Sequence, residues 1–386
     1  MLKVVKVRIY PNAIQKQLIN KTFGSCRYVY NMLLDAKIKA YECGDNLSAY
    51  ELKKRLVPMK NVEGGEFLKE VDSTALQNAV LKIDIAYKNF FRRVRQGGAV
   101  GFPRFKSKHN SYQSYQSSTS TIKNNKLKLP KIGEVKTKFH RGVIVGKIKT
   151  VTISCEANQY FASINYEDGL ENIIGSKNGK TIAIDVGVKV FAYTSEKKPI
   201  HPKKEHDLSK DIKKMIKAQK SLSRKKKGSA NRLKAKSKLA KKHLKIKNKR
   251  NDFLHKISNK LSENQTIKVE DLKIKNMSKK AKGTLTNPNI RASAKAGLNR
   301  SILQQSWGKF FEMLEYKLKR NGGELIKVNP QYTSQKCSSC GHISKENRIS
   351  QAKFKCTKCG LEMNADYNAS LNILNSTGVG TTLKAS

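Results

Sequence analysis

Four cysteines near the end of the sequence have the spacing of a metal site. They form two CxxC pairs, "CSSC" at 337–340 and "CTKC" at 356–359, separated by 15 residues. Two such knuckles can place four thiolates around one tetrahedral Zn²⁺, an ion that accepts soft ligands and needs no redox chemistry. Four unrelated buried thiols are not expected at this spacing. The sequence therefore predicts one closed, structural zinc site in a ribbon that depends on its metal to fold, with the ligands Cys337, Cys340, Cys356 and Cys359.

A single aspartate inside an apolar strand pattern is the second candidate. In "TIAIDVGVKV", residues 181–190, Ile182, Ile184 and Val186 alternate with smaller or polar residues, which predicts a pleated strand with an apolar face. Asp185 is a poor strand former, and a buried carboxylate is unfavourable unless it is hydrogen-bonded or binds a cation. Taken alone, Asp185 fits a hydrogen-bonded structural acid as well as a metal ligand.

Further acids border two other apolar elements. "QTIKVEDLKIKNM" reads as a strand that ends in Glu270 and Asp271, and "NADYNASLNIL" places Asp366 at the start of a helix, where an aspartate is ordinarily a cap. The joint pattern changes the interpretation, because the chain otherwise contains few acids. Converging carboxylates suit Mg²⁺, and two such ions can activate water and stabilise a leaving oxygen in phosphodiester hydrolysis. We therefore expect these acids to bind two magnesium ions.

The charge balance indicates the partner. The 386 residues include 79 Lys and Arg against 29 Asp and Glu, a formal net charge of +50. Such an excess predicts a large anionic partner, and nucleic acid is favoured over an anionic membrane surface. The sequence shows no apolar run of about 18 residues and no signal peptide at its start. We therefore expect a nucleic-acid partner and no membrane.

Basic residues concentrate in two stretches. Residues 212–250 hold 18 Lys or Arg and no acid, and two helices with a turn near "KKGSAN" are expected there. Around residues 92–108, Arg and Lys interleave with Phe, so that cations could contact phosphates while rings stack on bases. The alternatives are a solvated helical face for the first stretch and a solvated loop with packed rings for the second. The expected nucleic-acid contacts are Arg92, Arg93, Arg104, Lys106, Arg224, Lys225, Lys226, Lys227 and Arg232.

The remaining patterns supply the elements that must position these residues. "MLKVVKVRIYP" reads as a strand, and helices are predicted from Asn12 to about Tyr41 and from Ser73, as the cap, through "FFRRVRQGG". Residues 126–167 return to strand patterns and, with the first strand, suggest a small β-barrel interrupted by helices. A Gly- and Asn-containing loop is expected to about residue 299. "SILQQSWGKFFEMLEYKLKRNGG" then predicts one amphipathic helix, with a core face of Leu303, Trp307, Phe310, Leu314 and Leu318.

Nine segments spread over nearly the whole chain are specific as a combination. They are "RIYPNAIQKQLINKTFGSCRYVYN", "GFPRFKSK", "AIDVGVKVFA", "SRKKKGSANR", "VEDLKIKNM", "SWGKFFEMLEYK", "YTSQKCSSCG", "ENRISQAKFKCTKCG" and "NADYNASLNIL". In these segments the sequence resembles the TnpB (OrfB) family of transposon-associated, RNA-guided DNA endonucleases with a RuvC-like nuclease domain. The resemblance implies that the nuclease motifs fall on Asp185, on Glu270 rather than Asp271, and on Asp366; many relatives have a DRD triplet where this chain has "NAD" at 364–366.

The resemblance also implies an α+β multidomain architecture. An N-terminal β-barrel contains an inserted helical recognition lobe, and an RNase H-like (RuvC) α/β nuclease follows with an inserted zinc ribbon. The implied partners are a guide RNA from the transposon end and double-stranded target DNA, in a prokaryotic cytoplasm and at the nucleoid. The expected ranges are 1–11 and 119–172 for the barrel, 12–118 for the lobe, 178–332 and 363–376 for the nuclease core with basic helices at 212–260, 333–362 for the zinc ribbon, and 377–386 for a tail.

The expected function is RNA-guided, Mg²⁺-dependent hydrolysis of guide-matched double-stranded DNA. No compact base-reading motif is found that could specify a long target, and a guide would supply that choice. The alternative is a non-cleaving RNA-guided DNA-binding repressor on the same scaffold, which has no use for all three acids. A transposase that joins DNA ends itself uses similar metal chemistry and is disfavoured by the resemblance. The oligomeric state is left open.

Overall fold

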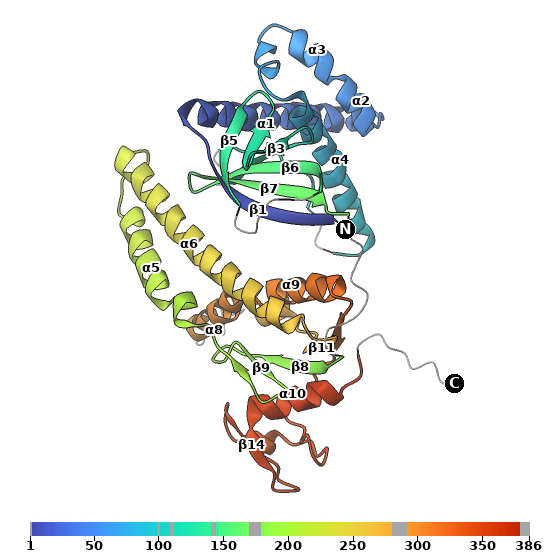
Figure 1. Ribbon diagram of the computed structural model, residues 1–386, viewed down its shortest axis with the longest axis vertical. Coiled ribbons are helices and arrows are strands. Elements are labelled where there is room, and N and C mark those ends of the chain that lie inside the picture. The colour runs from blue at the N-terminus through green and yellow to red at the C-terminus, as the bar shows by residue number, and fades with distance from the viewer. Residues whose placement is uncertain are drawn as a thin grey trace, which may run out of the picture. The chain divides into compact units, whose positions relative to one another are not determined.

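Helices and strands are mixed along the chain, as expected for an α+β protein. The computed structural model describes residues 2–98, 101–108, 112–139, 144, 146–169, 179–279 and 292–378. Two units can be separated, residues 1–171 with 218–244 (unit 1) and residues 172–217 with 245–386 (unit 2). Figure 1 shows the elements of each unit. The finer division into barrel, lobe, nuclease core and ribbon stays a prediction, and most of the expected tail lies outside the described residues.

Unit 1 contains a seven-stranded antiparallel sheet with the order β2-β6-β7-β1-β5-β4-β3. β1 (Leu2–Tyr10) buries Val7 and Ile9, which is the period-two pattern of a strand with one face on a core. β2 lies inside the range expected for the helical lobe. The other strands are β2 (Tyr112–Ser117), β3 (Thr121–Lys123), β4 (Lys126–Leu129), β5 (Gly133–Lys138), β6 (Lys147–Glu156) and β7 (Gln159–Glu167).

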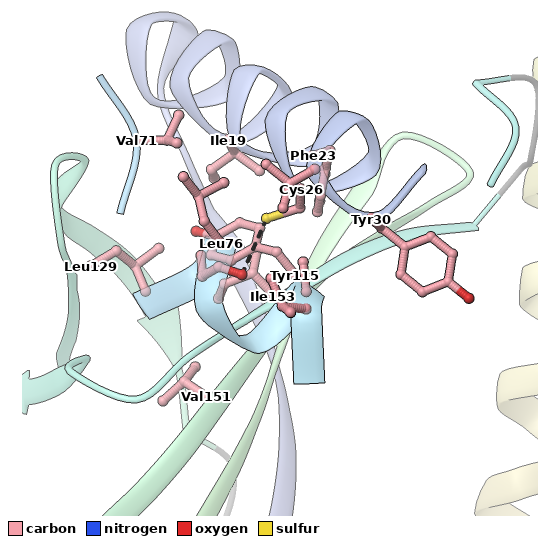
Figure 2. Packing of buried hydrophobic residues seen from close by; sticks show 14 of the residues in the cluster. Ile19, Phe23, Cys26, Tyr30, Val71, Leu76, Tyr115, Leu129, Val151 and Ile153 are labelled. Carbon is pink, nitrogen blue, oxygen red and sulfur yellow. Dashed lines mark hydrogen bonds between the residues drawn. The ribbon is translucent and has the colours of Figure 1, made fainter. Parts of the chain in front are cut away.

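Two long helices, α1 and α4, pack against this sheet and share the core of unit 1 with it. Figure 2 shows Phe23 and Cys26 of α1 lying close to Leu76 of α4 and to Tyr115 and Ile153 of the sheet. The Cys26 thiol donates to the Ala75 carbonyl at 3.5 Å, which satisfies its only polar group. The helices are α1 (Ala13–Glu42), α2 (Ala49–Lys54), α3 (Leu56–Asn61) and α4 (Ser73–Arg95), with a 3-10 turn η1 (Glu66–Leu68).

The two long helices begin at polar caps. Asn12 caps α1 as expected: its side chain accepts from Gln15 N at 2.8 Å, and the Gln15 side chain accepts from Asn12 N at 3.1 Å. The cap of α4 was expected at Ser73 and is Asp72 instead. The Asp72 carboxylate accepts from Thr74 N at 2.9 Å and also from the Ser117 hydroxyl at 2.7 Å. A tertiary contact to β2 therefore decides between two adjacent capping candidates.

The basic stretch forms two helices, as expected. α5 (Ser209–Ser223) and α6 (Ala230–Leu261) are joined by a turn over residues 224–229. α5 follows the 3-10 turn η2 (Lys204–His206). No helix of the described part of the chain is long and apolar enough to cross a membrane.

Unit 2 is built on a five-stranded sheet with the order β10-β9-β8-β11-β12. β8, β11 and β12 are parallel, whereas β9 and β10 join antiparallel. Ile184 of β8 pairs with Val269 of β11, so the next residues, Asp185 and Glu270, lie at the same end of adjacent strands. The strands are β8 (Thr181–Val186), β9 (Ala192–Thr194), β10 (Pro199–Ile200), β11 (Thr266–Glu270) and β12 (Glu324–Val328).

Helices cover both faces of this sheet (Figure 1). Ile182 and Ile184 of β8 pack in one core with Phe310 of α9, whereas Ala183 between them packs with Ile373 of α10. Successive side chains of β8 thus pack into two apolar layers, one on each face of the sheet. The helices are α7 (Ile274–Met277), α8 (Ala292–Gln305), α9 (Trp307–Arg320) and α10 (Ala365–Asn375); the hairpin β13 (Lys353–Lys355) and β14 (Glu362–Asn364) and the turn η3 (Lys345–Asn347) precede α10.

The single amphipathic helix expected over 301–323 is wrong, because the chain breaks it at Ser306. Ser306 is left-handed, with φ 59°, and separates α8 from α9. α8 begins at Ala292, inside the range expected for a loop. Leu303 is 55% exposed instead of buried, whereas its neighbour Ile302 is the α8 residue that packs in the core with Phe310. The other expected core residues are buried: Trp307, Phe310, Leu314 and Leu318.

Candidate metal centres and nucleic-acid contacts

The four expected zinc ligands lie together. The Sγ atoms of Cys337 and Cys359 are 3.7 Å apart, those of Cys340 and Cys356 are 3.5 Å apart, and all four lie within 4.8 Å of one another. This is the arrangement that four thiolates need to surround one ion. Among the described residues, these cysteines are the one group of three or more potential His, Cys, Asp or Glu ligands gathered this closely.

Both knuckles are built in the same way. In the first, Gly341 N donates to Cys337 O at 3.0 Å and Cys337 N donates to His342 O at 2.9 Å. In the second, Gly360 N donates to Cys356 O at 3.0 Å, and Cys356 N donates to Leu361 O at 2.9 Å. Each turn needs a left-handed residue, and both glycines have φ 74°, which a residue without Cβ adopts without strain.

Thiolate formation is favoured at one cysteine of the second knuckle, Cys356. The Cys359 N–H donates to Cys356 Sγ at 3.4 Å, and this hydrogen bond lowers the pKa of the Cys356 thiol to about 6. A metal ligand must be deprotonated, so the backbone prepares the sulfur for a soft cation. The donor set and its geometry therefore fit a thiolate-bound metal.

A buried asparagine joins the two knuckles. Asn347 Nδ2 donates to Gln335 O at 2.9 Å, before the first knuckle, and Asn347 Oδ1 accepts from Thr357 N at 2.9 Å, within the second. Its side chain is fully buried. The position of the next residue, Arg348, is therefore fixed by the folded ribbon.

The three acids line one pocket of about 360 Å³ in unit 2. Asp185 and Glu270 lie at the ends of β8 and β11, and Asp366 lies in the first turn of α10. The capping role considered for Asp366 belongs to Asn364, whose Oδ1 accepts from Asp366 N at 3.0 Å and from Tyr367 N at 3.1 Å. The Asp366 carboxylate is thus not used as the helix cap.

The electrostatics of the pocket favour a bound cation. Burial raises the pKa of Asp185 well above its usual range, and the carboxylates of Glu270 and Asp366 raise it further. Burial also raises the pKa of Glu270 and of Asp366. The Arg348 guanidinium opposes all three shifts. Oxygen donors with this excess of negative charge suit Mg²⁺.

The three acids are spread more widely than the four cysteines: they are not among the potential ligand groups whose atoms all lie within 4.8 Å of one another. Ions in a two-metal site lie about 3.5–4 Å apart, and each retains several waters. Three carboxylates around a common pocket can therefore serve such a site without all contacting one ion.

Two further pocket residues were not found from the sequence. Arg348, carried by the ribbon, lies with its Nη2 3.4 Å from Asp366 Oδ1. Thr333 donates its hydroxyl to Glu270 Oε1 at 2.5 Å. Both stand within segments that carry the family resemblance, but neither has a spacing or composition that points to a role.

The expected nucleic-acid contacts fall into two groups. The side chains of Lys106 and Arg232 have structural partners: the Lys106 ammonium lies 3.8 Å from the centre of the Tyr30 ring, and Arg232 Nη1 donates to Leu222 O at 2.9 Å and to Lys225 O at 2.8 Å. Burial lowers the pKa of Lys106 to about 8. The exposed residues of the set are Arg92, Arg93, Arg104, Arg224, Lys225, Lys226 and Lys227.

Three family models match successive parts of the chain. "Helix-turn-helix domain" (HTH_OrfB_IS605) matches residues 1–46, "Probable transposase" (OrfB_IS605) matches 171–281, and "Cas12f1-like, TNB domain" matches 307–373. The described residues of the first match form one strand and one helix, β1 and α1. Two of the three models are OrfB models, which indicates an OrfB-type protein.

Relatives match nearly the whole chain. It is 36% identical over 377 residues to "Putative RNA-guided DNA endonuclease InsQ" of Escherichia coli (strain K12), covering 97% of this chain and 92% of that protein. It is 33% identical over 381 residues to "Putative RNA-guided DNA endonuclease" of Streptomyces pristinaespiralis, covering 96% and 88%. The chain belongs to the TnpB (OrfB) family, as the sequence motifs indicated.

A solved structure shares the fold. The protein in "Cryo-EM structure of the Cas12f1-sgRNA-target DNA complex" matches with a TM-score of 0.56 and 14% identity, over 97% of this chain and 99% of that one. At this identity the match concerns the fold alone.

Proposed function

We propose that this chain is an Mg²⁺-dependent endonuclease that hydrolyses double-stranded DNA selected by a guide RNA, and that the guide comes from the end of the transposable element. The names of its E. coli and Streptomyces relatives support RNA guidance and DNA cleavage. The formal charge of +50 suits both nucleic acids.

The observation that carries this proposal is the meeting of Asp185, Glu270 and Asp366 in one pocket. They come from two parallel strands and a helix that are widely separated in sequence, in a chain with few acids. The mixed sheet with helices on both faces supports an RNase H-like (RuvC) core around them. A protein that only bound DNA would gain nothing from three carboxylates that repel one another and the DNA.

The residues of the pocket would divide the chemistry. When bound, two Mg²⁺ ions supply an activated water and stabilise the leaving oxygen of the phosphodiester. Asp185, Glu270 and Asp366 would hold the ions. Arg348 lies at the same pocket and can donate to a phosphate oxygen, since a guanidinium matches phosphate geometry.

The rest of the chain would hold the nucleic acids and the pocket in place. The exposed cations of the α5–α6 turn, Arg224 and Lys225–Lys227, suit sequence-blind contacts to a backbone, as do the exposed arginines at 92, 93 and 104. Cys337, Cys340, Cys356 and Cys359 hold one structural Zn²⁺. The N-terminal β-barrel with its inserted recognition lobe remains part of this proposal.

The test is reconstitution of the purified chain with and without the RNA that co-purifies with it. The substrate is a plasmid that carries the guide-matched target beside a randomised flank. We expect a double-strand break only with RNA, Mg²⁺ and the matched target. Equal cutting without RNA, or cutting unaffected by scrambling the guide, would leave an unguided nuclease. Guided binding with no cutting at any Mg²⁺ concentration would identify a repressor.

A further inference from the structure

We propose that Thr333 is a positioning residue for Glu270, and that α10 holds Thr333 in place. This inference rests on the proposed nuclease function and adds to it a residue outside the acidic set. The same helix would then place Asp366 directly and Glu270 through Thr333. Its basis is a set of hydrogen bonds among buried side chains and one unusual backbone conformation.

The hydrogen bond between Thr333 and Glu270 is short, and Thr333 is shielded from solvent. Thr333 Oγ1 lies 2.5 Å from Glu270 Oε1, and Thr333 is 6% exposed. A hydroxyl has one hydrogen to donate, and the other acceptor, Pro330 O, is farther away at 3.1 Å. A charged acceptor also forms the stronger hydrogen bond. The hydroxyl therefore holds Oε1 of Glu270 and leaves Oε2 for a cation.

The backbone before Thr333 is held in a rare conformation. Tyr332 is left-handed, with φ 62°, which is unfavourable for a bulky side chain. Its carbonyl accepts from both Gln335 N and Lys336 N at 2.9 Å. Strained residues of this kind persist where the surrounding structure determines them strongly, often at functional sites. Here the turn directs the next side chain, Thr333, towards Glu270.

Two buried asparagines of α10 hold the same turn. Asn372 Nδ2 donates to Thr333 O at 2.9 Å and to Lys336 O at 2.7 Å, and Asn368 Nδ2 donates to Lys336 O at 2.8 Å. Asn368 is fully buried and Asn372 nearly so. Because Asp366 precedes them on the same helix, α10 fixes the position of Thr333 relative to Asp366.

The expected effect follows from the freedom of a glutamate side chain. Without the hydroxyl, Glu270 can rotate between conformers, and only some of them present an oxygen to an ion. Loss of a residue that orients a metal ligand typically weakens metal binding by about 10–100-fold. The loss falls on metal affinity, not on the binding of guide or target.

The experiment compares Thr333→Val, which keeps the shape but removes the hydroxyl, with Thr333→Ser, which keeps the hydroxyl. One measurement is the Mg²⁺ concentration that gives half-maximal cleavage by the RNA-loaded protein. The other is Mn²⁺ binding to the full chain without DNA, followed by electron paramagnetic resonance. We expect Thr333→Val to shift both by about 10–100-fold and Thr333→Ser to shift neither appreciably.

The matched control is Ser370→Ala, which removes a buried hydroxyl that lies on α10 itself. That hydroxyl donates only to its own helix, to Tyr367 O at 2.7 Å, so neither measurement should change. Zinc content and melting temperature check that each variant is folded. Thr333→Ala decides the question if Thr333→Val melts early, since it removes the same hydroxyl without adding a methyl group.

The outcomes separate this inference from the proposed function. If the wild-type chain cuts with RNA and Mg²⁺ while a folded variant without the hydroxyl matches it in both measurements, the positioning role is wrong. If the wild-type chain neither cuts guided targets nor binds Mn²⁺, the nuclease proposal itself is wrong.

Discussion

The cysteine cluster and the acidic pocket are the two candidate metal sites of unit 2, but the chain assembles them differently. The cysteines lie within residues 337–359, and each pair is shaped by hydrogen bonds of its own knuckle. The acids lie at residues 185, 270 and 366, and only the pairing of β8 with β11 and the packing of α10 bring them together. The first geometry is local, and the second depends on the whole sheet.

The two sets also differ in what the loss of a ligand does. The four cysteine sulfurs lie within 4.8 Å of one another, so loss of one thiolate should weaken the expected zinc site and with it the fold of the ribbon. The acids repel one another, so removing one carboxylate lowers the electrostatic repulsion in the folded protein. The same change removes an expected metal ligand. We therefore expect substitutions in the ribbon to act first on the fold, and substitutions in the pocket to act first on the chemistry.

The largest expected effect is loss of cleavage when a pocket acid is removed. Asp185→Ala, Glu270→Ala or Asp366→Ala should each lower the cleavage rate by at least about 10³-fold, since several kcal/mol of transition-state stabilisation is lost. Guided DNA binding should be largely kept, because no phosphate-binding cation is removed. Plasmid cleavage and gel-shift assays measure the two.

A neighbouring acid supplies the control for these variants. Asp271 forms an ion pair with Lys273 and does not line the pocket, so Asp271→Asn should cut at the wild-type rate. A variant of Asp185, Glu270 or Asp366 that still cut at ordinary Mg²⁺ concentrations would remove that residue from the site.

Removal of a cysteine should change zinc content and stability before chemistry. We expect one zinc per wild-type chain and much less in Cys337→Ser or Cys359→Ser, with a lower melting temperature for both. Cys43→Ser changes an exposed cysteine outside the cluster and should keep its zinc. Elemental analysis is the direct measurement. Folded, active wild-type protein without zinc would contradict the structural site.

Arg348 tests the link between the two regions, because the ribbon carries it and its Nη2 lies 3.4 Å from Asp366 Oδ1 in the pocket. Arg348→Ala should reduce cleavage roughly 10–100-fold, the loss expected when a charge-assisted contact to the reacting phosphate is removed. Zinc content should stay at the wild-type value, since Arg348 contacts no cysteine knuckle. An unchanged cleavage rate would exclude a contact between Arg348 and the reacting phosphate.

The smallest expected effect is a pH dependence of stability without magnesium. The pKa of Asp185 is raised in the folded state, so its protonated form favours folding below the unfolded value of about 3.9, and this contribution is lost as pH rises through the folded pKa. Asp185→Asn should therefore melt higher than the wild type by a few degrees near neutral pH, and less so in acid.

The measurement is thermal melting at several pH values in magnesium-free buffer without a chelator, so that zinc is retained. Added Mg²⁺ should raise the melting temperature of the wild type and not that of the variant. A difference in melting temperature between wild type and variant that did not grow with pH would show that folding does not raise the pKa of Asp185.

The sequence alone predicted those features whose geometry is set by residues close together in the chain. The spacing of four cysteines defined their cluster, and the polar residue before α1 defined its start. For the acids, the strand patterns and the resemblance indicated the residues, but not what contacts them. Thr333 reaches Glu270 across 63 residues, and nothing in the pattern of either segment indicates that contact.

Packing explains what the sequence patterns could not resolve. A charge count cannot distinguish Lys106, which lies over the Tyr30 ring, from the exposed Arg104 nearby. The apolar pattern of 301–323 runs across Ser306 with no Gly or Pro at the break, so the two helices were expected as one. Asp72 and Ser73 are both good caps, and the contact from Asp72 to Ser117 on β2 decides between them.

The late position of α10 has a consequence for the order of folding. β8 and β11 precede it by many residues, yet the pocket is incomplete until α10 packs beside them with Asp366. Such long-range contacts form slowly, and chains fold progressively from the N-terminus during synthesis. A nascent chain stopped before residue 365 could carry the basic helices and both strands, and so could engage RNA while lacking one ligand for magnesium. Nuclease competence would therefore begin only after translation has passed the ribbon, which separates assembly with the guide from the first opportunity to cut.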